Sequence, residues 1–138
     1  MSWLLFAVGS AFFAGITAIL AKIGIQSVLS HLATALRTGV VLVFAWGMVF
    51  LVGSQGDLAQ LTGGDLAWLV LSGLATGASW LCYFRALQAG PASVVVPIDK
   101  LSILVTILFS GLVLKETLNR KAALGLVLIL AGTGAMLL

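Results

Sequence analysis

The distribution of charge is the strongest constraint on what this chain can fold into. Five long stretches carry at most two charged side chains each. They cover residues 3–21, 31–53, 66–84, 91–114 and 122–138. A helix needs about 20 apolar residues to cross roughly 30 Å of hydrocarbon, and in lipid a helix satisfies its own backbone groups. The sequence therefore predicts an all-α membrane protein with five transmembrane helices.

Composition excludes the common soluble classes. Hydrophobic residues make up 62% of the chain and charged residues 8%, whereas a typical soluble domain has about 25% charged residues. A soluble domain of this size could not bury so much apolar surface. The net charge of +3 comes from basic residues scattered along the apolar segments, so it gives no support to nucleic-acid binding.

Short connections separate the apolar stretches. Residues 55–65 form the one polar loop of any length. Ser30, Asp65 and Asn119 are the predicted N-caps of the helices that follow them. Because helices joined by short loops pack as antiparallel neighbours, we expect residues 1–138 to form a single five-helix transmembrane domain.

Three charged residues fall inside the apolar stretches, where a charge is costly and marks a candidate functional site. At 1.5 Å per residue, Arg37 lies about 10 Å along its helix, and Asp99 and Lys100 lie about 12 Å along theirs. Asp99 and Lys100 are adjacent, so in a regular helix they point about 100° apart and do not pair well with each other. We expect Arg37 to be the partner of Asp99, and the ring face of Trp80 to be the partner of Lys100. Pro97 removes a helical hydrogen bond and is predicted to kink the helix just before these charges.

Two interpretations of these charges stay open. Asp99 is the preferred proton or substrate site, because a bent helix with a charge usually lines a water-filled cavity. The alternative is that Arg37 and Asp99 form a buried ion pair that only fixes the packing of helices. Tyr83 and Thr17 are further candidates for lining the path, but Thr17 can instead bond back to its own helix.

The remaining polar residues are interpreted as structural. Lys22 and Arg85 lie close enough to helix ends to extend toward water, His31 is an interfacial polar residue, and Glu116 organises the turn before the last helix. Cys82, the single cysteine, is interpreted as a small buried side chain. With no redox, hydrolytic or metal-binding constellation in the sequence, we predict no enzyme activity, no cofactor and no metal.

Two glycines mark a candidate helix-packing face. Gly125 and Gly132 are seven residues apart and lie on the same side of the last predicted helix, a spacing that suits a long helix–helix seam. Small residues let helices approach closely in lipid. We expect this face to pack against another helix, and the alternative to a contact between chains is packing within the same chain.

A set of short motifs runs through the second half of the chain. They are Trp80 with Tyr83, Ala86-Leu87, Gly90-Pro91-Ala92-Ser93, Pro97, Lys115-Glu116-Thr117-Leu118 and the helix from Gly125 to Gly134. Together with Arg37, their order and spacing resemble an EamA-type domain of the drug/metabolite transporter superfamily.

The resemblance implies a secondary transporter, an exporter or exchanger of small metabolites, amino acids or drugs, in the inner membrane of a bacterial or archaeal cell. Most members are similar to two such units fused into ten helices, with the halves inverted in the membrane. This chain has one unit, so we expect it to be half of an inverted-repeat transporter that works as a homodimer. The alternative is a non-transporting scaffold or auxiliary subunit of a larger membrane complex.

The basic residues give no preferred orientation in the membrane. One set of connections carries Lys115, Arg120 and Lys121, and the opposite side has Lys22, Arg37 and Arg85. An excess of Lys and Arg sets the orientation of membrane proteins, so a balanced chain can insert both ways. An antiparallel homodimer would then rebuild the inverted pair of a ten-helix relative.

Overall fold

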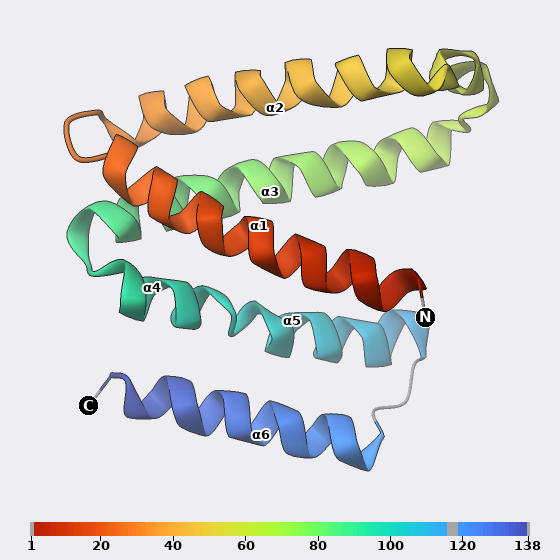
Figure 1. The fold of residues 1–138 in the computed structure, drawn as a ribbon. Helices are drawn as coiled ribbons and strands as arrows, with labels where there is room; N and C mark the ends of the chain where they lie inside the picture. Colours follow the sequence, from red (N-terminus) through yellow and green to blue (C-terminus); the bar gives the residue numbers. More distant parts are fainter. Residues whose placement is uncertain (1, 116–118, 138) are drawn as a thin grey trace. The chain divides into compact units, whose positions relative to one another are not determined.

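The computed structural model describes residues 2–115 and 119–137, and the regular structure in this part of the chain is helical. These residues contain six α-helices, with a 3-10 segment after the second helix and a π-helical turn after the fifth (Figure 1). The elements are α1 (Ser2–Gly24), α2 (Ser30–Val52), η1 (Ser54–Gln60), α3 (Gly63–Ala89), α4 (Ala92–Asp99), α5 (Ser102–Phe109), η2 (Ser110–Leu114) and α6 (Arg120–Ala135).

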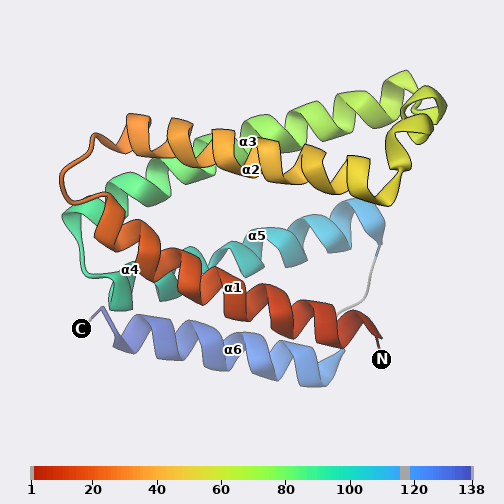
Figure 2. The same ribbon diagram turned by 45° about the horizontal axis from the view of Figure 1, so that its top comes forward.

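The chain divides into two compact units. One consists of residues 19–88, in which α2 and α3 run side by side in opposite directions, as Figures 1 and 2 both show. The other consists of residues 1–18 and 89–138, in which α4 contacts α6. The antiparallel arrangement of α2 and α3 agrees with the expectation from their short connection.

Four segments of the described chain are long and apolar enough to cross a membrane, and the prediction of five is wrong. They are Trp3–Gly24, Ser30–Val52, Gly63–Ala89 and Ala92–Leu114. The last apolar stretch forms α6, which has 16 residues and is therefore about 24 Å long. This length is short of the roughly 30 Å hydrocarbon core.

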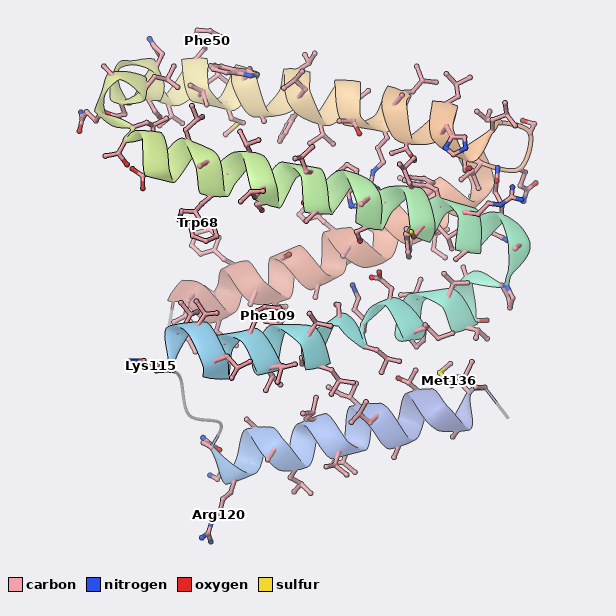
Figure 3. The ribbon with its side chains drawn as sticks, turned by 180° about the vertical axis from the view of Figure 1, so that it is seen from behind. Phe50, Trp68, Phe109, Lys115, Arg120 and Met136 are labelled. Atoms are coloured by element: carbon pink, nitrogen blue, oxygen red, sulfur yellow. The ribbon has the colours of Figure 1, made fainter. Side chains whose placement is uncertain are left out.

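Few side chains are buried within the chain, as expected where lipid covers the outer surface of helices. The buried apolar residues among those described are Ala18, Ile25, Phe84 and Leu87. Leu87 is 0% exposed and Ile25 is 1% exposed, and both belong to the unit of residues 19–88. Most other large apolar side chains point outward, as Figure 3 shows for Phe50 on α2. In lipid such helices associate through close packing and hydrogen bonds rather than through burial from water.

The helix starts confirm one predicted cap and correct two. Asn119 caps α6, with its Oδ1 accepting from the backbone N–H groups of Lys121 at 2.7 Å and Ala122 at 3.2 Å. Asp65 is not the N-cap of α3. Its Oδ2 accepts from the N–H of Thr62 at 3.1 Å, and its own N–H donates to Thr62 Oγ1 at 3.2 Å. This reciprocal pair is a capping box, in which the hydroxyl residue precedes the acid by three positions.

Ser30 is likewise not an N-cap. It is the first residue of α2, and the preceding Leu29 has extended backbone angles and makes no side-chain capping bond. The carbonyl of Ser30 instead accepts the hydroxyl of Thr34 at 2.9 Å. Glu116 and the motif of residues 116–118 lie outside the described residues.

The fourth apolar segment is interrupted where its charges lie. Helix α4 ends at Asp99, and α5 begins at Ser102. Within the interruption the N–H of Leu101 donates to the carbonyl of Ile98 at 2.9 Å, three residues back instead of four. Pro97 lies inside α4 and has no N–H to offer the preceding turn. The helix is therefore interrupted after Asp99, two residues beyond Pro97, and the predicted kink just before the charges stays a prediction.

Candidate functional site

An arginine over two aromatic rings is the main polar feature of the unit of residues 19–88. The guanidinium carbon of Arg37, on α2, lies 4.2 Å from the centroid of the Trp80 ring and 5.5 Å from that of Phe84, both on α3. Trp80 and Phe84 are one helical turn apart, so they present neighbouring rings on one face of α3. Phe84 is 2% exposed, and Arg37 and Trp80 are half-buried.

The ring contact leaves the hydrogen-bonding capacity of Arg37 unused. Within residues 19–88, the side chain of Arg37 makes no hydrogen bond and no ion pair. No buried side-chain nitrogen or oxygen atom in this part of the chain lacks a partner, so the guanidinium nitrogens are not sealed off. A guanidinium offers five N–H donors in a planar fork that matches a carboxylate or a phosphate. Arg37 is thus held in place by aromatic rings while its donors stay accessible.

The second charged feature belongs to the other unit. Lys100 Nζ lies 3.5 Å from Asp99 Oδ2, although a good pair of these neighbours was not expected within a regular helix. The expectation assumed a regular helix, but the helix ends at Asp99 and Lys100 lies in the turn that follows. The side chains of Lys100 and Asp99 are 59% and 36% exposed, and such an accessible pair is weakly coupled.

The two expected long-range partners have different outcomes. The ring face of Trp80, expected to hold Lys100, holds Arg37. The pair of Arg37 with Asp99 would join the two units, and it stays a prediction.

The remaining candidates are placed but not brought into one cluster. Tyr83 is half-buried and its ring lies edge-on to Phe84, with 6.2 Å between centroids. Thr17 is half-buried on α1, in the other unit. A methyl group built at Gly125 or Gly132 meets no atom within 4 Å. Close packing within the described chain therefore does not require glycine at these two positions.

Hydrogen bonds from two side chains to distant carbonyls were missed by the sequence analysis. Gln88 Nε2 donates to the carbonyl of Val28 at 2.6 Å and to that of Ile25 at 3.2 Å. Lys22, expected to extend toward water, donates from Nζ to the carbonyl of Leu87. These bonds join the turn between α1 and α2 to the end of α3, and they fix the helix ends nearest to Arg37. The available sequence signal was that Lys22 and Gln88 are polar residues near helix ends. This signal did not identify their partners, because the partners are backbone carbonyls.

Comparisons with known proteins give one consistent result. The profile of the EamA-like transporter family matches residues 1–138. A Sinorhizobium sp protein, named an uncharacterized transporter in the cobO 3′ region, is 45% identical over 131 residues, which cover 95% of this chain and 93% of that protein. An Erwinia tasmaniensis protein is 37% identical over 85 residues, 59% of this chain and 79% of its own length. It is named a probable 4-amino-4-deoxy-L-arabinose-phosphoundecaprenol flippase subunit ArnE. No solved structure matches the chain.

Proposed function

Because the chain belongs to the EamA-like transporter family, as its motifs indicated, we propose that it is a secondary transporter whose substrate path is lined by Arg37 and Trp80. Membership of the family supports a multi-pass membrane transporter of the drug/metabolite type. The proposal adds the mode of action, export or exchange of a small metabolite, amino acid or drug across the inner membrane.

The observation that carries the proposal is the state of Arg37. A cation in an apolar span is costly unless it is paired or lines a cavity, and the Trp80 ring supplies part of the compensation. The unused N–H donors then suit the polar group of a passing substrate. Transporters built from inverted repeats bind substrate near the middle of the bilayer, and Arg37 lies about 10 Å along α2 from its start.

We assign the coupling step to the interrupted fourth segment. Asp99 is half-buried beside the break that follows α4, and irregular backbone at membrane depth is tolerated only where it is buried in protein or lines water. Protonation of Asp99 would release Lys100 from its ion pair and change the charge of the path. Pro97, Lys100, Tyr83 and Thr17 complete the proposed lining.

The experiment is counterflow in proteoliposomes with the purified full-length chain. A thermal-shift screen of metabolites first selects compounds that raise the apparent stability, because a ligand of the folded state does so by mass action. Vesicles preloaded with a selected compound should accumulate the labelled compound, and the Arg37→Gln variant should not. Equal accumulation by vesicles without protein would overturn the transport proposal.

A scaffold or auxiliary subunit is the second candidate function. The observation that favours this alternative is that the Erwinia tasmaniensis relative is named as a subunit of a flippase. A single unit of this size then needs a different partner chain to complete a transporter. Absence of counterflow by the purified chain, with flux restored by a co-purified second protein, would support this alternative.

We propose that the active form is a homodimer that uses the Gly125 and Gly132 face of α6, with the two copies in opposite orientations. A methyl group at either glycine meets open space within the described chain, which leaves the face available to a second copy. Gly125→Leu with Gly132→Leu should shift the protein toward monomer in detergent. Gly134→Leu is the matched control, since it also meets open space but lies on another side of the helix.

An unchanged dimer fraction in the double variant would place the interface elsewhere. Orientation is measured with an impermeant maleimide on whole cells, using Asp57→Cys in a Cys82→Ser background. Labelling of about half of the chains is expected for a population inserted both ways, and labelling of all or none contradicts it.

A further inference from the structure

An open pocket lies beside the end of the unit formed by residues 19–88. It has a volume of about 520 Å³ and is lined by Ser30, His31, Leu81, Cys82 and Arg85. The first two residues begin α2, and the other three lie in the last third of α3. The pocket therefore belongs to two antiparallel helices of one unit, and it is separate from the ring contact of Arg37.

The pocket lies at the depth of lipid head groups. His31 is the second residue of α2, and Arg85 precedes the end of α3 at Ala89 by four residues, or about 6 Å along the helix. Both helices are long and apolar enough to span a bilayer, so their ends reach the interfacial layer that flanks the hydrocarbon core. Leu81, on the same wall, is 40% exposed and gives the pocket an apolar side.

The charge of the pocket is positive and unbalanced within its unit. Arg85 and His31 come from different helices and line the same space. Within residues 19–88, the side chains of His31 and Arg85 make no hydrogen bond and no ion pair. The acids of this unit, Asp57 and Asp65, lie at the opposite end of α2 and α3, and the 20 residues between Asp65 and Arg85 correspond to about 30 Å of helix.

Cys82 corrects an expectation and offers a probe of the pocket. The sequence analysis interpreted it as buried, but it is exposed. Phe84, two residues further along α3, occupies the buried face, so Cys82 points to the other side of the helix. As the single cysteine of the chain, it reports on whatever fills the pocket.

We propose that this pocket binds the phosphate group of a membrane lipid. The guanidinium of Arg85 supplies a planar fork of donors that fits phosphate oxygens, and the imidazole N–H of His31 supplies a second donor from the facing helix. The volume lies within the range of small-molecule sites, so it accommodates a head group and its glycerol rather than a bare ion. The opening and the exposed Leu81 leave room for the acyl chains to extend along the apolar surface of α3. This proposal does not depend on transport.

The test measures the rate at which N-ethylmaleimide alkylates Cys82 in the purified full-length chain in detergent. Three additives are compared: dioctanoyl-phosphatidylglycerol, dioctanoylglycerol with the same acyl chains and no phosphate, and inorganic phosphate. We expect the phosphatidylglycerol to slow alkylation by about fivefold when the pocket is filled, and the other two additives to leave the rate unchanged, because charge-assisted hydrogen bonds and acyl contacts are both required.

Variants identify the residues that hold the phosphate. Arg85→Gln should raise the half-protecting concentration of phosphatidylglycerol by about tenfold, the effect of losing one charge-assisted contact. Arg85→Lys should recover part of the protection, and His31→Gln should have a smaller effect. Arg120→Gln is the matched control, since Arg120 starts α6 and its side chain points away from that helix (Figure 3). The half-protecting concentration of this variant should equal that of the unmodified chain.

Two results would overturn the proposal. Equal protection by dioctanoylglycerol, or protection unaffected by Arg85→Gln, would show an apolar groove without a phosphate site. Protection by inorganic phosphate with none by phosphatidylglycerol would refute the lipid source. Native mass spectrometry of the Cys82→Ser chain gives a second measurement that does not depend on alkylation. The chain should retain bound phosphatidylglycerol, and adding Arg85→Gln should remove it.

Discussion

In residues 19–88 the cation within a span, Arg37, lies over an aromatic ring contributed by a neighbouring continuous helix. In the unit of residues 1–18 and 89–138, Asp99 and Lys100 instead lie where the helix is interrupted, and they pair with each other in an accessible position. A ring contact between helices depends on how the helices pack, whereas an accessible ion pair between neighbours does not. We therefore expect substitutions at the ring contact of the first unit to change stability as well as transport, and substitutions of the charges in the second to change transport more than stability.

The largest expected effect is on flux and comes from Asp99→Asn, which keeps the shape of the side chain and removes its charge. If Asp99 carries the proton, proton-coupled flux in proteoliposomes should fall at least about a hundredfold, the scale of losing one acid–base group. The remaining flux should lose its dependence on pH. Asp57→Asn, in the exposed segment η1, is the control and should behave as the unmodified chain.

An unchanged pH profile in Asp99→Asn would remove Asp99 from the coupling step. Loss of folded protein would instead favour the alternative in which Asp99 and Arg37 form a packing ion pair, and the contrast between the two units would then fail.

The next largest effect is on stability and comes from Trp80→Leu. The substitution removes the ring under Arg37 and leaves a half-buried cation without its contact, so we expect a loss of about 2 kcal/mol in the free energy of unfolding. Trp68→Leu, on the same helix, is the matched control, because Trp68 is 74% exposed and its loss should cost under about 0.5 kcal/mol. Reversible unfolding in mixed micelles measures both, and equal costs would show that the ring contact of Arg37 adds nothing.

A third effect tests what holds the first unit together. Gln88→Leu removes the donor to the carbonyls of Val28 and Ile25, and we expect a loss of about 1 to 2 kcal/mol since two part-buried acceptors lose their partner. Gln60→Leu is the control, because Gln60 bonds only to the exposed Asp57, at 3.3 Å. If the two variants have the same free energy of unfolding, the turn between α1 and α2 is stabilised by other contacts.

The sequence predicted those features that depend on local chemistry. The helical class and the start of α6 at Asn119 follow from hydrophobicity and a capping side chain. The sequence did not predict contacts whose acceptor is distant in the chain or belongs to the backbone. The donors Lys22 and Gln88 meet backbone carbonyls at least 60 residues away in the sequence, and any residue type offers such a carbonyl.

The unexpected pair of charges and the wrong number of spans have one cause, the assumption that every apolar stretch forms a regular helix. Asp99 and Lys100 pair because α4 ends at Asp99 and α5 begins only at Ser102. The stretch of residues 122–138 is apolar throughout, yet the helix that it forms has 16 residues, from Arg120 to Ala135. Hydrophobicity indicates where a helix can lie in lipid, but the length of the helix also depends on the residues at which its backbone hydrogen bonds begin and end.

The smallest expected effect comes from Lys100→Gln, and it tests the comparison most directly. The pair with Asp99 is 3.5 Å long and its lysine side chain is 59% exposed, so screening by solvent limits its contribution, and the free energy of unfolding should change by under about 0.5 kcal/mol. Addition of salt should likewise leave the unfolding midpoint of the unmodified chain in place. Transport should respond instead, because Lys100 is a charged residue of the proposed path, and flux in proteoliposomes should fall. A loss of about 2 kcal/mol in Lys100→Gln, with no change in flux, would assign the charges of the interrupted segment to packing and would make the two units alike.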